Sequence, residues 1–170
     1  VSPPGGCAIG ARPIDQHLKG LTAMGAVIEL EHGYVTATAP RGRLHGAAFT
    51  FDGQTVTGTE NVMMAATLAD GRTVLRNCAR EPEVVDLAAA LVRMGARIEG
   101  AGTDEIRVDG VERLRPLDHH VIADRIEAGT FMVAGALPGC DVVVKGCAAA
   151  NLEALVEELR AVGATVTEVE

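Results

Sequence analysis

The fold of this chain is decided by the stretch Leu91-Val92-Arg93-Met94-Gly95-Ala96-Arg97-Ile98, because its pattern occurs three times in the sequence. Related stretches run from residue 21 to 28 and from residue 159 to 166, so that the glycines lie 70 and then 68 residues apart. Each stretch follows apolar residues at helical spacing and places Gly where the end of a helix needs a positive φ. The chain is therefore predicted to repeat one structural unit.

Alternating apolar and polar residues after the first of these glycines predict a hairpin. Residues 27–30 turn at Glu31-His32-Gly33 into residues 34–38, a pattern that is typical of two antiparallel strands. Pro13 and Pro82 suit a first helical turn, and Asn151 is predicted to cap the helix that follows it.

A second, weaker repeat completes the predicted unit. Residues 65–71 align with residues 133–139, and these segments lead into short β-rich runs at 73–75 and 142–144. Each unit then reads helix, strand, helix, strand, strand, which predicts an α/β fold with sheets covered by helices.

The charge and composition of the chain exclude several classes of partner. Fifteen Lys and Arg residues against 23 Asp and Glu residues give a net charge of −8, so binding to nucleic acid or to an anionic membrane, which needs a basic face, is not expected. Aromatic residues make up 2% of the chain, so the core is expected to consist of aliphatic residues and Met. No apolar run approaches the roughly 18 residues of a membrane span. We expect a cytoplasmic protein.

The cysteines occur in two kinds of sequence context. They form no CxxC pair and have no His at metal-ligand spacing, which predicts reduced thiols without a metal. Cys7 lies in a glycine-rich loop five residues before Arg12. The glycines allow backbone conformations that other residues rarely adopt, and the Arg12 guanidinium suits a phosphate or a carboxylate. The loop is predicted to present the Cys7 thiol, whereas Cys78, Cys140 and Cys147 border apolar runs and are expected to be buried or inert.

Four collinear motifs together resemble the UDP-N-acetylglucosamine 1-carboxyvinyltransferase family of enolpyruvyl transferases. They are the cysteine loop at residues 4–15 and the motifs at residues 55–66, 79–86 and 124–131. Agreement of four separate motifs over nearly the whole chain is far more specific than any one of them. The resemblance implies two domains, each an inside-out α/β barrel of three βαβαββ units, with an incomplete barrel in this chain.

The resemblance also implies an activity. Members of this family transfer the enolpyruvyl group of phosphoenolpyruvate to the 3-hydroxyl of UDP-N-acetylglucosamine and release phosphate, with no metal or organic cofactor. This transfer is the first committed step of peptidoglycan synthesis, and it links the family to cell wall biogenesis, cell shape, cell division and the cell cycle. Cys7 would protonate the methylene carbon of phosphoenolpyruvate, could add covalently to that substrate, and would be the target of fosfomycin. A thiol with a pKa of about 8.5 can serve as an acid at pH 7 and as a nucleophile once deprotonated.

Two segments are implied to hold the substrates. Arg12 would meet the phosphate of phosphoenolpyruvate. The uridine and diphosphate would be held around Arg12, Pro13, Ile14, Asp15 and Gln16, together with Gln54, Thr55, Val56 and Thr57. The sequence departs from the family at Gln16, where Leu is common, at Thr57, where Gly is common, and at Gly53, where some members have Lys.

Other polar residues in these motifs are interpreted as structural. Ion pairs or helix-end charges explain them slightly better than substrate contacts do; they are Arg80, Glu81, Glu83, Asp124, Arg125 and Glu127. His119 and His120 match no family role and are expected to face solvent.

The resemblance further predicts how the chain divides. Residues 1–122 would be the later part of the cysteine-bearing domain, and residues 123–170 would begin the second domain after a crossover near Pro116. The family's Lys-Asn pair, Asp base and further arginines have no match in this sequence, so we expect an internal fragment that is inactive by itself. An incomplete barrel leaves sheet edges and apolar helix faces open, so the isolated chain could pair with a second copy.

Two alternatives remain open. The sister transferase that acts on shikimate 3-phosphate shares the repeat architecture but normally lacks the loop cysteine, so Cys7 argues against it. A non-catalytic module that binds a nucleotide sugar or serves in assembly is compatible with an incomplete site. The sequence has no GxxxxGK[ST] loop, which disfavours an ATP-dependent phosphoryl transferase.

Overall fold

A computed structural model describes residues 13–169 of the chain. These residues belong to two compact units, of which the first ends at His119 and the second begins at His120. Cys7 and Arg12, the predicted acid and the predicted phosphate contact, lie outside the described residues. None of the helices within residues 13–169 is long and apolar enough to cross a membrane.

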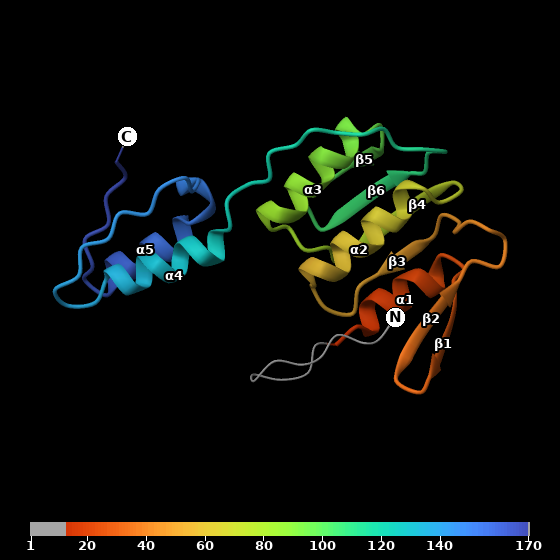
Figure 1. The fold of residues 1–170 in the computed structure, drawn as a ribbon, viewed down its shortest axis with the longest axis horizontal. Helices are drawn as coiled ribbons and strands as arrows, with labels where there is room; N and C mark the ends of the chain where they lie inside the picture. Colours follow the sequence, from red (N-terminus) through yellow and green to blue (C-terminus); the bar gives the residue numbers. More distant parts are fainter. Residues whose placement is uncertain (1–12, 170) are drawn as a thin grey trace. The chain divides into compact units, whose positions relative to one another are not determined.

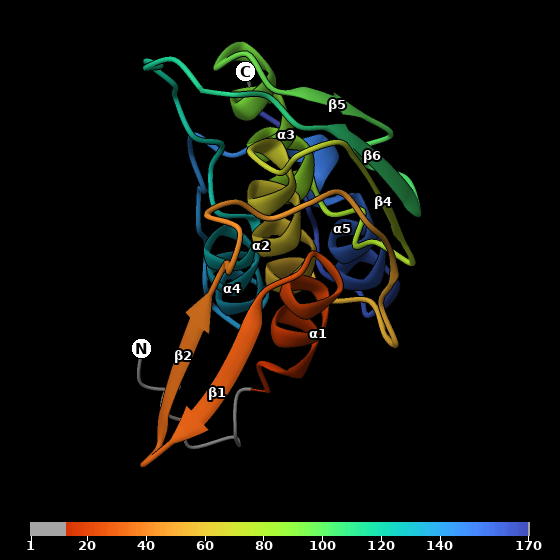
Figure 2. The same cartoon turned by 90° about the vertical axis from the view of Figure 1, so that its right-hand side faces the viewer.

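The first unit contains two β-sheets (Figure 1). Its elements are α1 (Asp15–Ala23), β1 (Val27–Glu31), β2 (Tyr34–Thr38), β3 (Ala48–Thr50), α2 (Val56–Thr67), β4 (Arg72–Arg76), α3 (Pro82–Arg93), β5 (Arg97–Glu99) and β6 (Glu105–Asp109). Strands β1 and β2 form the predicted antiparallel hairpin, which extends beside α1 (Figure 2). The turn of this hairpin places His32 and Gly33 at φ of 50° and 77°, as a tight two-residue turn requires.

The elements from β3 to β6 form one complete βαβαββ unit. Their sheet has the strand order β3-β4-β6-β5. β3 and β4 are parallel because α2 carries the chain back across the sheet, while β4 with β6 and β5 with β6 are antiparallel. The unit that the sequence repeat predicts is therefore present in full between residues 48 and 109.

The second unit is helical within the described residues 120–169. It contains α4 (Arg125–Gly135), the short 3-10 helix η1 (Ala149–Asn151) and α5 (Glu153–Ala161). The strand predicted at residues 142–144 and a hairpin after Gly163 are not formed there. Asn151 lies inside η1, and Leu152 caps α5 without a side-chain hydrogen bond, so the predicted cap is wrong. A strand needs a partner for its backbone groups, and no strand is available to pair with it among residues 120–169.

The three repeat glycines end their helices in the same way. Gly25, Gly95 and Gly163 have φ of 90°, 105° and 95°. At each helix end the glycine N–H donates to the carbonyl three residues earlier, and the next N–H donates to the carbonyl five residues earlier, all at 2.9 to 3.0 Å. This is the Schellman arrangement, which needs the left-handed backbone that glycine adopts without strain. The three helix ends are equivalent, as the repeat predicts, but the prediction that each leads into a hairpin is wrong for Gly163, because residues 164–169 form no strand.

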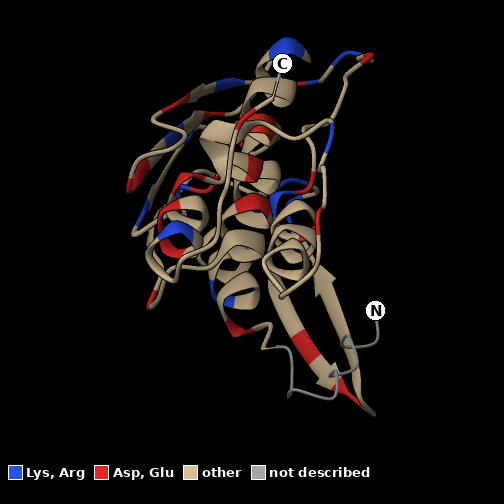
Figure 3. Cartoon of the chain, turned by 90° about the vertical axis from the view of Figure 1, so that its left-hand side faces the viewer, with Lys and Arg blue, Asp and Glu red and all other residues tan. Residues whose placement is uncertain are grey.

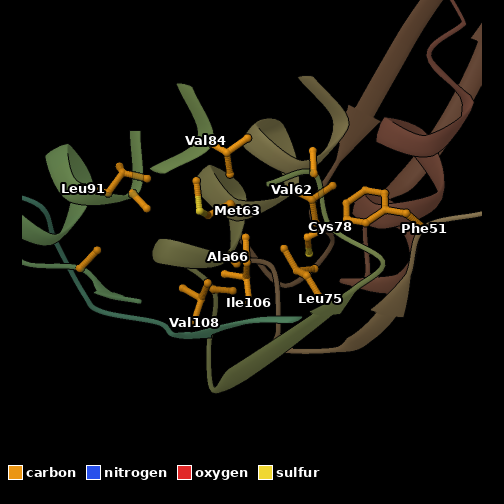
Figure 4. Close-up of a cluster of buried hydrophobic side chains, with 14 of the residues drawn as sticks. Phe51, Val62, Met63, Ala66, Leu75, Cys78, Val84, Leu91, Ile106 and Val108 are labelled. Atoms are coloured by element: carbon orange, nitrogen blue, oxygen red, sulfur yellow. The ribbon is translucent and has the colours of Figure 1, made fainter. Parts of the chain in front are cut away.

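The core of the first unit lies between its four-stranded sheet and helices α2 and α3 (Figure 4). Met63 and Ala66 of α2 and Leu75, Ile106 and Val108 of the sheet are fully buried. The predicted aliphatic and Met-rich composition is confirmed, with Phe51 as the one aromatic ring among the fully buried residues that the structure describes.

Candidate substrate-binding site

Pro13, Ile14, Asp15 and Gln16 lie at the start of α1. Ile14 is the N-cap residue, and its carbonyl accepts a hydrogen bond from the Leu18 N–H at 3.1 Å. Within residues 13–169, no side chain caps this helix. The N-terminus of a helix is the end where an anion is favoured.

Gln54, Thr55, Val56 and Thr57 lie at the start of α2. Thr55 is the N-cap residue, and its hydroxyl oxygen accepts a hydrogen bond from the Gly58 N–H at 3.2 Å. The Thr55 side chain therefore stabilises the helix. Gln54 precedes this cap and is exposed, so its amide is free to contact a ligand while the cap is kept.

Gln16 joins these two predicted segments. Its Nε2 donates to Asp52 Oδ2 at 2.9 Å, and its Oε1 accepts from the Asp52 N–H at 3.1 Å. The same Nε2 lies 2.8 Å from Asp15 Oδ2. A Leu side chain, which the resemblance predicts to be common at this position, could make none of these hydrogen bonds. The Gln16 side chain thus joins the start of α1 to the loop before α2.

Asp52 is the residue of this contact that the sequence did not single out. Lys19 forms an ion pair with it. The hydrogen bond from Lys19, followed by that from Gln16, lowers the pKa of Asp52, and the hydrogen bond to Asp52 raises the pKa of Lys19. The Asp52-Gly53 dipeptide is a turn signal, which predicts a loop but not its partners. The ion pair holds the loop before α2 against α1.

A third motif contributes to the same region. An open depression of about 480 Å³ is lined by Gln54, Arg80 and Glu81. Glu81 is the N-cap residue of α3, and its carboxylate accepts from the Arg80 N–H at 2.8 Å. The Arg80 guanidinium lies 4.0 Å from Asp104, and both side chains are exposed. Arg80 therefore offers a solvent-accessible cation beside a predicted nucleotide contact.

The loop that carries Arg80 is fixed by hydrogen bonds at its start. Asn77 has φ of 57°, and its Nδ2 donates to the Phe51 carbonyl at 2.9 Å. Two residues later the Ala79 N–H donates to the buried Thr59 hydroxyl at 3.1 Å. Asn tolerates the left-handed backbone better than most residues. These contacts tie the loop after β4 to the end of β3 and to α2.

Residues of both charge signs are distributed along the described chain. In the view of Figure 3, Lys and Arg positions are interspersed with Asp and Glu positions. Among residues 13–169, no group of three or more His, Cys, Asp or Glu side chains is arranged to hold a metal ion. Basic side chains such as Arg80 and the N-termini of helices suit an anionic ligand.

The structure also shows the contacts and the exposure of other residues that the sequence analysis singled out. Asp124 caps α4 by accepting from the Ile126 and Glu127 N–H groups at 2.8 and 3.2 Å. Cys78 is buried, and burial raises the pKa of its thiol to about 11, so it stays protonated at neutral pH. Of the other two cysteines that were expected to be buried or inert, Cys140 is exposed and Cys147 is half-buried.

His119 also differs from its prediction. Its side chain is 18% exposed and lies 3.1 Å from both carboxylate oxygens of Asp86, whereas His120 is exposed. The partner of His119 lies 33 residues earlier in the chain, so no local sequence pattern could have indicated it.

Comparison with known proteins shows to which family this chain belongs. A sequence profile described as EPSP synthase (3-phosphoshikimate 1-carboxyvinyltransferase) matches residues 1–170. The chain belongs to the EPSP synthase family. Two solved structures of this kind are similar to it: EPSP synthase from Acinetobacter baumannii and the enolpyruvyl transferase NikO from Streptomyces tendae. Their TM-scores are 0.67 and 0.64 at 25% and 26% identity, over 92% and 75% of this chain and 36% and 32% of theirs. The predicted enolpyruvyl transferase fold is confirmed.

Within the EPSP synthase family, the chain is similar to proteins named UDP-N-acetylglucosamine 1-carboxyvinyltransferase. It is 79% identical over 170 residues to the one from Anaeromyxobacter sp. (strain Fw109-5) and 62% identical over 167 residues to the one from Myxococcus xanthus (strain DK1622). These matches cover 100% and 98% of this chain but 40% and 39% of the relatives. The resemblance read from the four motifs is confirmed, and the chain spans about two fifths of the length of these curated relatives.

Proposed function

We propose that the protein containing this chain transfers the enolpyruvyl group of phosphoenolpyruvate to the 3-hydroxyl of UDP-N-acetylglucosamine and releases phosphate. The identity of 79% along the whole chain to a relative that bears this activity in its name carries the proposal. The reaction would be the first committed step of peptidoglycan synthesis, in the cytoplasm, and would serve cell wall biogenesis, cell shape and cell division through the cell cycle.

The proposed chemistry assigns the central step to Cys7. Its thiol donates a proton to the methylene carbon of phosphoenolpyruvate while the sugar 3-hydroxyl, losing its own proton, forms a bond to the neighbouring carbon. Loss of one proton from the new methyl group and departure of phosphate then restore the carbon–carbon double bond. A thiol suits this role because it is mostly protonated at pH 7 and yet gives up its proton readily. As thiolate it would open the epoxide of fosfomycin, forming a carbon–sulfur bond.

The described residues support the proposed grip on the nucleotide sugar. The starts of α1 and α2 are held together by Gln16 and Asp52, and Gln54 shares a depression with Arg80. Backbone N–H groups at two helix starts and one exposed guanidinium suit a diphosphate. We assign the uridine and diphosphate to Pro13, Ile14, Asp15, Gln16, Gln54, Thr55, Val56 and Thr57, and the phosphate of phosphoenolpyruvate to Arg12.

We further propose that this chain holds part of the active site. Residues 1–122 would belong to the cysteine-bearing domain and residues 123–170 to the start of the other, and sequence outside this chain would supply the remaining catalytic groups. The isolated chain would then show no turnover above background, and its open apolar surfaces could pair with a second copy.

The choice of acceptor tests the proposal. Phosphate release by the full-length protein should require phosphoenolpyruvate together with UDP-N-acetylglucosamine, and shikimate 3-phosphate should give no release. Release with shikimate 3-phosphate alone would favour the sister transferase. Binding of UDP-N-acetylglucosamine in calorimetry, with no turnover of either acceptor, would identify a non-catalytic module instead.

A further inference from the structure

The segment that leaves the first unit is attached to α3 at several points. The Arg115 N–H donates to the carbonyl of Met94, the C-cap residue of α3, at 2.8 Å. Three residues later, Arg93 Nη2 donates to the Asp118 carbonyl at 3.1 Å. Residues 115 and 118 are therefore attached to the C-terminal end of α3.

His119 makes the last of these attachments. Its Nε2 lies 3.1 Å from both Asp86 oxygens, and its Nδ1 lies 3.4 Å from Arg93 Nη1. A guanidinium can only donate hydrogen bonds, so Nδ1 accepts from Arg93 and Nε2 carries the proton that Asp86 accepts. One imidazole thus contacts an acid and a base that lie two helical turns apart on α3.

The burial of this contact distinguishes it from an ordinary surface ion pair. The His119 and Asp86 side chains are 18% and 17% exposed, whereas those of the Arg72–Asp109 pair are 61% and 39% exposed. Hydrogen bonds to a charged group are stronger and less screened when water is largely excluded. We therefore expect the His119–Asp86 contact to stabilise the local structure more than an exposed ion pair does.

We propose that Asp86, Arg93 and His119 form a crossover clamp that fixes where the first unit ends, so that the joint to the second unit begins at His120. The boundary between the two compact units falls between His119 and His120, and His120 is exposed. Because α3 also borders the core through Val84, Ala88 and Leu91, the crossover clamp connects the start of the joint to the rigid part of the first unit. Its members are positioning residues for the crossover segment, residues 115–119.

Hydrogen exchange on the full-length protein tests the crossover clamp without reference to the reaction. His119→Ala should speed exchange of the Arg115 amide, whose N–H donates to the Met94 carbonyl, by about tenfold, while α3 keeps its protection. His120→Ala, the matched control, should leave this exchange unchanged. The exchanged pair Asp86→His with His119→Asp places the same two groups in reversed order and should restore protection. Unchanged exchange in His119→Ala, or equal acceleration in His120→Ala, would overturn the proposal.

A distance measurement tests the positioning role itself. Two spin labels on the full-length protein, one on α3 and one on the crossover segment, should give a broader distance distribution in His119→Ala than in the unsubstituted protein, and the exchanged pair should narrow it again. Arg93→Lys keeps the positive charge but cannot donate to both Asp118 and His119, so it should broaden the distance distribution less than His119→Ala does. Arg93→Lys replaces His119→Ala in this experiment if His119→Ala fails to fold. Identical distance distributions in all variants would overturn the crossover clamp, whatever the activity of the protein. A broader distribution in a protein that has no transferase activity would support the crossover clamp and refute only the proposed function.

Discussion

The two units of this chain share one helix-ending signal but differ in what surrounds it. Helices α3 and α5 both end on a glycine with positive φ and the same pair of backbone hydrogen bonds. Around α3 lies a continuous core that runs from Met24 to Val108, whereas the buried apolar residues of the second unit are Ala128, Leu152 and Leu159, within residues 120–169. A local signal therefore forms with or without a sheet, and a dense core forms only where strands find partners.

Equivalent leucines should show this difference most strongly. Leu91 and Leu159 occupy the same repeat position and are 6% and 7% exposed. Leu91→Ala should cost about 2 to 4 kcal/mol of unfolding free energy, since it opens a cavity in the main core. Leu159→Ala should cost less than half as much, because fewer buried side chains surround it. Hydrogen exchange of each unit measures both losses, with the exposed Leu30→Ala as control. Equal losses would show that the second unit has a core as dense as the first.

Alanine at the repeat glycines should instead affect the two units equally. Gly95→Ala and Gly163→Ala should each cost about 1 to 2 kcal/mol, the strain of a left-handed residue with a Cβ atom. An added Cβ would meet no other atom within 4 Å at either position, so strain alone acts. Gly53→Ala, which also has open space but no positive φ, is the matched control for urea unfolding. A much larger loss in one unit would mean that the two helix ends are not equivalent.

Capping residues provide a smaller comparison between the units. Asp124→Ala should destabilise α4, and Thr55→Ala should destabilise α2, each by about 1 kcal/mol. Asp124 accepts from two N–H groups and Thr55 from one, so the loss at Asp124 should be at least as large. Asp124→Asn, which can still accept, should recover most of the stability. Amide exchange in the first turn of each helix reports the loss, and no change there would contradict the assigned caps.

The smallest expected effect depends on pH. Burial, and then the nearby Glu83 charge, raise the pKa of Glu60 on α2. The native state therefore holds this proton more tightly than the unfolded chain, so stability falls as pH rises from the ordinary Glu range through the raised pKa. Glu60→Gln should increase stability at pH 7 by less than about 1 kcal/mol, and the gain should vanish below about pH 4. A gain that persists in acid would show that charge is not its cause.

Local patterns in the sequence predicted a large part of the fold. The glycine spacing indicated the helix ends, and the repeated patterns indicated the order helix, strand, helix, strand, strand that residues 56–109 adopt. The full βαβαββ unit was implied by the resemblance of the motifs. Residues 142–144 have the composition of a strand but no partner within residues 120–169, so their β propensity is not realised there.

The site was predicted less completely than the fold. The motifs indicated Gln16 and Gln54, yet not Asp52, because the Gln16–Asp52 contact joins residues 36 apart in sequence. His119 was misjudged for the same reason: its environment depends on Asp86 and Arg93 of α3. Contacts of this kind arise from how the elements pack, and composition around one position does not predict them.

Replacement of Cys7 in the full-length protein tests the central claim most directly. Phosphate release from phosphoenolpyruvate and UDP-N-acetylglucosamine should fall by at least about a hundredfold in Cys7→Ala, because alanine can neither donate a proton nor form an adduct. The exposed Cys140 supplies the matched control, and Cys140→Ala should keep the full rate. Full activity in Cys7→Ala would contradict the account, since the loop thiol would then have no part in the transfer.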